Sequence, residues 1–250
     1  EIIQLIKELQ NEFSECPMQS LYSKYQSYHA HQMSTEEVLD VLMRCCVELI
    51  SVEAPEWELI AARFLMKKIN LMVDKAWESE GGCTFYERIR RMSEEGYYGS
   101  YILENYSEEE VSELEGYLKE ENNRLFTYSG LDLLMKRYLI RSYDHRILEK
   151  PQEMFMGIAM HLAIPEKENR VFWAKEIYDV LSALKATMAT PTMANSRKPY
   201  HQMSSCFIDT VEDSLDGIYK SLDNFAKVSK YGGGMGLYFG KVRASGSDIR

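Results

Sequence analysis

The chain has 250 residues, 45% of them hydrophobic, which is enough for one or two domains with a buried core. Its 29 basic and 39 acidic residues give a net charge of -10, which argues against broad binding to nucleic acid or to an anionic membrane. No apolar run approaches the roughly 20 residues of a membrane helix, and the charged N-terminal segment is unlike a signal peptide. We therefore expect a cytoplasmic protein with neither a nucleic acid nor a membrane as partner.

Residues 1–180 are predicted to form one helix after another, because apolar residues recur at spacings of three and four between glycine and proline breaks. A capping box pairs a serine with a glutamate three residues later, and proline suits the first turn of a helix. These signals predict helix starts at Ser34 with Glu37, Pro55, Ser107 with Glu110, and Pro151. The apolar stripes of these helices are interpreted as ordinary core.

The cysteines indicate a reducing compartment, because they are odd in number and show neither a disulfide framework nor a zinc spacing. They are Cys16, Cys45, Cys46, Cys83 and Cys206. Cys45 and Cys46 lie inside an apolar helical pattern and are predicted to be core thiols. His29 and His31 are interpreted as loop residues, so we expect no metal site on this chain.

The character of the sequence changes near Ala189. Turn-forming residues precede a predicted strand at 204–209, a helix begins near Asp213, and a second apolar run covers 235–242. Strand, helix and apolar run are typical of the opening of an α/β unit. The glycines of 232–236 suit either a tight turn or the close approach of a ligand, and their spacing is not that of a P-loop or a dinucleotide fingerprint.

Four segments in this order resemble the large subunit of class I ribonucleotide reductases. They are PQEMFMGIA, TPTMANSRKPYHQMSSCF, EDSLDGIY and KYGGGMGLYFGKVRASGSDIR, which begin at residues 151, 190, 212 and 230. The resemblance implies a mainly α N-terminal domain that leads into the first strands and helices of a ten-stranded α/β barrel. The barrel is expected to be truncated in this chain.

The resemblance also implies a division into three parts. Residues 1–75 are expected to be the end or remnant of an ATP-cone-like helical region, and residues 76–188 a helical N-terminal domain. Residues 189–250 are expected to begin the barrel, with the substrate cysteine and elements of the effector site. Because the chain starts at Glu1 and stops at Arg250 after a loop-like segment, we expect a fragment that lacks the radical cysteine and is inactive alone.

The reaction implied by the resemblance is reduction of ribonucleoside diphosphates to 2′-deoxyribonucleotides, through a protein thiyl radical and two reducing cysteines. Cys206 matches one member of this redox-active pair, a role that needs a thiol able to donate hydrogen and then form a disulfide. Cys206, Thr190, Ser205 and Gly234 match substrate-binding positions. Thr190 precedes Pro191 and is predicted to be extended. Strict strand alternation would point the Ser205 side chain away from the Cys206 face, so a backbone contact is expected.

Asp213, Ser214 and Leu215 match positions that bind a nucleoside triphosphate effector, and Arg243 and Arg250 match residues that grip its phosphates. Simple capping by Asp213 or Ser214 explains this helix start equally well. One face of the helix is apolar and is predicted to be buried, and the resemblance suggests that the same helix of a second subunit covers it. This face consists of Leu215, Ile218, Leu222 and Phe225.

The resemblance implies no cofactor on this chain itself. It implies ATP and deoxynucleoside triphosphates as allosteric effectors, and a small subunit that carries a metal-radical cofactor. Thioredoxin or glutaredoxin is the expected reductant, and the expected oligomer is a homodimer. Three alternatives stay open: an adenosylcobalamin-dependent ribonucleotide reductase, a non-catalytic nucleotide-binding or dimerisation module, and a purely structural helical protein.

Overall fold

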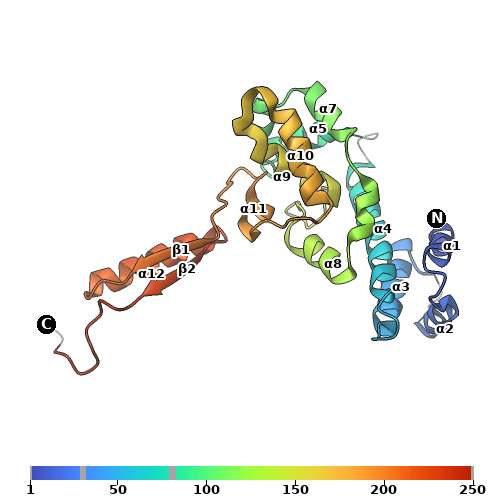
Figure 1. The fold of residues 1–250 in the computed structure, drawn as a ribbon, viewed down its shortest axis with the longest axis horizontal. Coiled ribbons are helices and arrows are strands. Elements are labelled where there is room, and N and C mark those ends of the chain that lie inside the picture. Colours follow the sequence, from blue (N-terminus) through green and yellow to red (C-terminus); the bar gives the residue numbers. More distant parts are fainter. Residues whose placement is uncertain (1, 29–31, 79–82, 249–250) are drawn as a thin grey trace.

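A helical body and a small strand-helix-strand unit make up the computed structural model, which describes residues 2–28, 32–78 and 83–248 (Figure 1). The body contains α1 (Ile2–Glu12), α2 (Met18–Tyr28), α3 (Thr35–Leu49), α4 (Trp57–Trp77), α5 (Phe85–Glu94), α6 (Tyr101–Asn105), α7 (Glu108–Glu115), η2 (Glu120–Leu125), α8 (Tyr128–Arg137), α9 (Pro151–Ala163), η3 (Ile164–Asn169), α10 (Arg170–Ser182) and α11 (Thr190–Asn195). The βαβ unit contains β1 (Cys206–Thr210), α12 (Leu215–Lys230) and β2 (Gly234–Tyr238). The fold is therefore mainly helical and ends in a small parallel sheet.

Local capping signals explain most helix starts. Both predicted capping boxes are confirmed, at Ser34 with Glu37 and at Ser107 with Glu110. A third box, Thr84 with Glu87, opens α5 and was not predicted. Pro151 is the first residue of α9, as predicted. The prediction for Pro55 was early by two residues: α4 begins at Trp57, and Pro55 lies in the turn before it.

The core of the body runs without interruption along the chain. Buried side chains form one cluster that extends from Leu9 to Met193 and includes Cys45 and Cys46, which are fully buried as predicted. Helix α9 lies in its centre, with every residue from Pro151 to Met160 buried. The expected boundary after residue 75 falls inside α4, and the cluster continues beyond residue 188 into α11. No described helix is both long and apolar enough to cross a membrane.

A buried ion pair fastens the end of α11 to the body. Arg197 is 0% exposed and Glu149 is 1% exposed, and the Arg197 Nε lies 2.9 Å from Glu149 Oε2. The guanidinium also donates to the carbonyl oxygens of Met193 at 2.8 Å and Tyr138 at 2.7 Å, while Glu149 accepts from the Ile140 amide at 2.7 Å. Because every charged atom has a partner, the pair holds the segment that follows α11 in one place.

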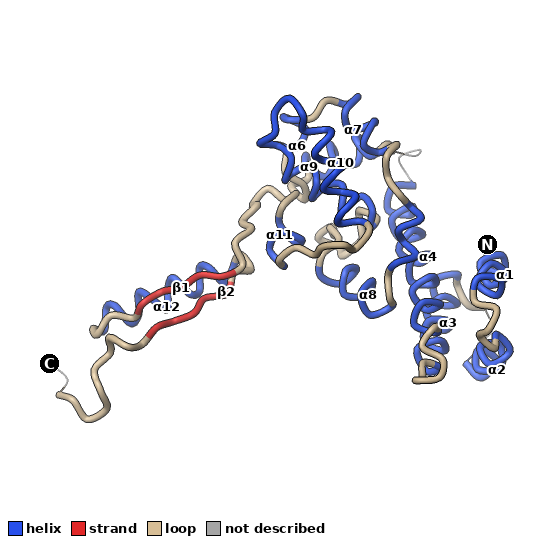
Figure 2. The backbone as a smooth tube through the Cα atoms, viewed as in Figure 1, coloured by secondary structure: helices blue, strands red, loops and turns tan. Residues whose placement is uncertain are grey.

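The predicted α/β unit is confirmed. Strands β1 and β2 are parallel, with α12 as the crossover, and they pair from Cys206 opposite Gly234 to Thr210 opposite Tyr238 (Figure 2). The two strands form the only named sheet of the described residues, and they match the start of a barrel rather than a closed one. The unit lies to one side of the helical body and joins it through the segment after α11 (Figure 1).

The apolar face of α12, which is predicted to be covered by a second subunit, is not buried within this chain. Leu215 is 70% exposed, and Ile218, Leu222 and Phe225 are also exposed. The helix instead turns a polar face to the sheet: Ser221 is buried, and the Asn224 amide lies 3.4 Å from Asp209 Oδ2 in β1. An apolar stripe of this size therefore stays open to a partner.

Candidate functional site

Cys206 is the first residue of β1 and differs from the other cysteines in its surroundings. Its thiol is exposed, whereas the other four cysteines are buried. Ser205 Oγ lies 3.4 Å from Cys206 Sγ, so the prediction that the Ser205 side chain turns away was wrong, because Ser205 precedes the first residue of the strand and need not follow its alternation. The Ser205 carbonyl oxygen accepts from the Gly234 amide at 2.7 Å, which joins the starts of the two strands.

The glycines before and in β2 have different reasons for lacking a side chain. Gly232 has a φ of +82°, which favours glycine, and it turns the chain from α12 into β2. A Cβ on Gly233 would lie 2.7 Å from Val228 Cγ1 and 2.8 Å from Phe207 Cε2, so packing excludes one. A Cβ on Gly234 would meet nothing closer than the Ser205 carbonyl oxygen at 3.5 Å. Packing of the described residues therefore does not require glycine at position 234.

Thr190 lies in a different conformation from the one predicted. It is the first residue of α11 and is helical, while Ala189 before it is extended. The local preference against helix before a proline is overridden because Pro191 fits the first helical turn, where its missing N–H costs nothing. The Thr190 hydroxyl remains exposed and lies 3.3 Å from Tyr138 Oη.

Asn195 connects α11 to both chain segments that lead into the sheet. Its Nδ2 donates to the carbonyl oxygen of Gln202, before β1, at 3.0 Å and to that of Tyr231, after α12, at 3.3 Å. The helix that carries Thr190 is thereby tied to the approaches of Cys206 and Gly234. Sequence reasoning missed this residue, because no motif marks an asparagine whose partners lie 7 and 36 positions away.

The residues predicted for the effector site gather at the opposite end of the sheet. Ser214 caps α12, as predicted, by accepting from the Gly217 amide at 3.0 Å. The Arg243 Nε donates to both carboxylate oxygens of Asp213, at 3.0 and 2.8 Å, and its Nη1 donates to the Asp248 carbonyl oxygen at 2.6 Å. The neighbouring Leu215 is exposed. Arg250 lies outside the described residues.

The two groups of predicted residues are separated by the length of the strands. Cys206 and Gly234 begin β1 and β2, whereas Asp213 and Arg243 follow the ends of the same strands. A five-residue strand spans roughly 13 Å at about 3.3 Å per residue. The sheet therefore has the Cys206 thiol at one end and the Arg243 guanidinium beyond the other, and both belong to the same βαβ unit.

The remaining candidates do not add to this site. The His201 ring packs against Tyr101, with centroids 4.6 Å apart, and against His161 at 5.4 Å, so it is engaged with the helical body. His29 and His31 lie outside the described residues. Within the ranges that the structure describes, no three His, Cys, Asp or Glu side chains come together in a way that could hold a metal ion.

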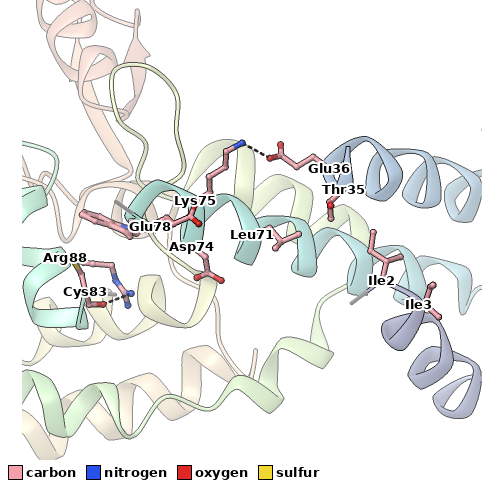
Figure 3. A pocket seen from close by; sticks show the side chains of 11 residues that line it. Ile2, Ile3, Thr35, Glu36, Leu71, Asp74, Lys75, Glu78, Cys83 and Arg88 are labelled. Atoms are coloured by element: carbon pink, nitrogen blue, oxygen red, sulfur yellow. Dashed lines mark hydrogen bonds and ion pairs between the residues drawn. The ribbon is translucent and has the colours of Figure 1, made fainter. Parts of the chain in front are cut away.

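A large cavity lies elsewhere in the helical body. It has a volume of about 890 Å³ and is lined by residues of α1, α3, α4 and the start of α5 (Figure 3). Acidic and basic side chains mix along its wall, and Lys75 there pairs with Glu36 at 3.4 Å. None of the residues predicted for substrate or effector lines this cavity.

Comparison with known proteins places both parts of the chain. A model described as the ribonucleotide reductase all-alpha domain matches residues 124–201, and a model described as the ribonucleotide reductase barrel domain matches residues 204–250. The boundary between the two models coincides with the segment that joins the helical body to the βαβ unit.

Curated relatives match along nearly the whole chain. The ribonucleoside-diphosphate reductase subunit alpha of Treponema pallidum is 49% identical over 251 residues, which cover 100% of this chain and 30% of that protein. The subunit alpha of Helicobacter pylori is 36% identical over 220 residues, covering 87% of this chain and 27% of that protein. The chain thus spans less than a third of the length of these relatives. From these matches and the geometry of both chain parts, we conclude that the chain belongs to the ribonucleotide reductase large-subunit family.

Proposed function

We propose that the protein is the large, catalytic subunit of a ribonucleoside-diphosphate reductase, which converts ribonucleoside diphosphates into 2′-deoxyribonucleotides. The observation that carries the proposal is the surroundings of Cys206. Its exposed thiol begins a strand, with a serine hydroxyl 3.4 Å away and a side-chain-free glycine opposite it. This arrangement leaves the sulfur accessible to a substrate.

The chemistry requires two thiols. The bond between C2′ and its hydroxyl breaks, the oxygen leaves as water, and C2′ gains a hydrogen. The two electrons come from a pair of cysteine thiols, which end as a disulfide. Cys206 is one of this pair, and Ser205 lies where its hydroxyl can hydrogen bond the sulfur or the substrate. The thiyl radical that starts the reaction depends on the metal-radical cofactor of a small subunit.

Effector control is proposed for the other end of the βαβ unit. Arg243 offers a planar cation beside the capped start of α12, which is a favourable place for phosphate. The exposed apolar face of α12 is proposed to pack against the same face in a second subunit, giving a homodimer. An effector bound near Asp213 would then lie beside this interface and bias substrate choice through the unit.

The naming of the relatives as alpha subunits supports a small subunit as partner in this family. Thioredoxin or glutaredoxin is the proposed reductant, because the disulfide formed in each cycle must be opened by thiol exchange. The odd number of cysteines, five, supports a reducing location, the cytoplasm.

The test is reduction of cytidine diphosphate by the full-length protein with its small subunit and thioredoxin. Cys206→Ser is expected to abolish turnover while dTTP binding persists, because serine cannot complete the two-electron step. Cys83→Ala, which changes a buried cysteine of the helical body, serves as the control and should retain turnover. Normal turnover by Cys206→Ser would refute the proposed role.

A further inference from the structure

The segment that leads into β1 is held by the side chain of Gln202. Its Nε2 donates to the Ser204 carbonyl oxygen at 3.0 Å, and its Oε1 accepts from the Ser204 amide. One side-chain amide therefore bonds both backbone groups of Ser204, in the way that a neighbouring strand bonds a backbone. Cys206, whose thiol is exposed, begins β1 two residues later.

The second strand does not extend as far as Ser204. The strands pair from Cys206 opposite Gly234, so the residue that would lie opposite Ser204 is Gly232. Gly232 has a φ of +82° and turns the chain from α12 into β2, which takes it out of the extended conformation of a strand. The Gln202 amide thus supports the backbone beyond the point where the sheet ends.

Gln202 is itself anchored to the helical body. Its carbonyl oxygen accepts from Asn195 Nδ2, in α11, at 3.0 Å. The ring of the preceding residue, His201, packs against Tyr101 of α6 and His161 of α9, with centroids 4.6 and 5.4 Å apart. The backbone of residues 201–202 is therefore tied to three helices, and the Gln202 amide extends that constraint toward β1.

We propose that Gln202 is a positioning residue for the Cys206 thiol. The inference rests on the proposed reductase function, in which this sulfur must meet the substrate C2′ and a partner thiol in turn. Reacting atoms must lie close and aligned, and a misplacement of about 1 Å can slow a reaction about a hundredfold. Because residues 201–205 belong to no helix or strand, the contact between Gln202 and Ser204 sets how the chain enters β1.

The test is steady-state reduction of cytidine diphosphate by the full-length protein with its small subunit and thioredoxin. Gln202→Met keeps the length of the side chain and removes both hydrogen bonds. We expect kcat to fall about tenfold or more, because the thiol is no longer held in place. The KM should stay within about twofold of the parent's value, since Thr190 and Gly234 are unchanged.

Two further variants separate positioning from general damage. Ser204→Ala is the matched control, because both bonds use the Ser204 backbone and survive the change, so its kcat should equal the parent's. Gln202→Glu keeps the acceptor for the Ser204 amide and loses the donor. Its kcat should lie between those of the parent and Gln202→Met. Circular dichroism shows that each variant is folded.

A second measurement does not depend on turnover. The rate at which iodoacetamide alkylates Cys206 is followed by mass spectrometry of its peptide, in the full-length protein without the small subunit. Gln202→Met should react about threefold faster or more than the parent, because the start of the strand opens more often once it is released. Ser204→Ala should react at the parent's rate.

Gln202→Met is the decisive variant. If its kcat equals that of Ser204→Ala, the proposal is overturned, also where only its KM rises, since that would place Gln202 in substrate binding. If the parent does not reduce cytidine diphosphate, the proposed function fails and the alkylation rates alone decide. A faster reaction of Gln202→Met then keeps the positioning of the thiol, and equal rates overturn it.

Discussion

Gly234 lies directly opposite Cys206 in the parallel β1–β2 pair, and its amide donates a 2.7 Å hydrogen bond to the Ser205 carbonyl oxygen. This one hydrogen bond holds together the backbone of Ser205, which precedes the thiol in the chain, and that of Gly234, which lies opposite it. Because position 234 is not crowded, it allows a test that separates function from folding.

Gly234→Ala is expected to leave the free energy of unfolding within about 0.5–1 kcal/mol of the parent, because the added methyl meets only ordinary contacts and glycine has little advantage in a strand. Substrate reduction should fall, since the methyl fills space beside the Cys206 thiol. Gly233→Ala should show the opposite pattern and lose about 1–3 kcal/mol through overpacking against Val228. Urea unfolding and turnover measured on both variants check this, and equal stability losses would contradict it.

Asn195→Ala should loosen the connection between α11 and the sheet. We expect faster amide hydrogen exchange over residues 202–206 and a higher KM, with about 1 kcal/mol lost in stability. The matched control is Asn224→Ala, which also removes an amide contact of the βαβ unit but does not touch α11. Exchange measured by mass spectrometry decides the matter: unchanged protection of 202–206 in Asn195→Ala would contradict a positioning role.

Arg243→Ala should weaken dTTP binding about tenfold or more, because it removes the planar cation at the effector end. The free energy of unfolding should change by less than about 1 kcal/mol, since the pair with Asp213 is exposed. Lys241→Ala removes the neighbouring exposed pair with Glu212 and should bind dTTP more nearly normally. Calorimetry on the two variants gives the comparison, and equal affinities would exclude a specific role for Arg243.

Arg197→Met should destabilise the protein by about 3–5 kcal/mol, because it leaves Glu149 buried without its partner. The double variant with Glu149→Met should recover part of this loss, since neither charge then remains buried. Urea unfolding of both proteins measures the difference. A double variant less stable than Arg197→Met would show that the charges are not coupled as the structure indicates.

The stability of the body should decrease as the pH falls from about 6.5 to 4. Burial, and next the neighbouring His201, lower the pKa of His161 from 6.5 to about 4, and Tyr101 is its other titratable neighbour. Over this window the unfolded chain takes up a proton that the folded protein refuses, so the free energy of unfolding falls, by about 1–2 kcal/mol after allowance for partial exposure. Above about pH 6.5, His161 is neutral in the folded and the unfolded protein, so it no longer lowers the free energy of unfolding.

His161→Gln should remove this part of the pH dependence, because glutamine does not titrate. His145→Gln, at an exposed loop position, is the control and should keep the parent's slope. Urea unfolding at pH 7 and at pH 4.5 provides the measurement. A slope that is the same in His161→Gln and in the parent would show that other groups cause it.

The short-range pattern of the sequence determined most of the secondary structure. The capping boxes at Ser34 and Ser107, the start of α9 at Pro151 and the cap at Ser214 depend on residues within one helical turn, so local hydrogen bonds decide them. The order of strand, helix and strand after residue 204 was also predictable from the alternation of apolar and turn-forming residues. The motif around Cys206 pointed to the correct family.

Contacts between distant residues were decided only by the tertiary structure. The apolar stripe of α12 predicted burial, but the direction that the stripe faces is set by the fit of Ser221 against β1. The basic residues that line the cavity between α8, α11 and the turn after α12 come from separate segments of the chain. No local sequence pattern predicts that they lie close together. Local sterics and hydrogen bonds are encoded within a few residues, whereas shared cavities and charge clusters arise only when packing brings separate elements together.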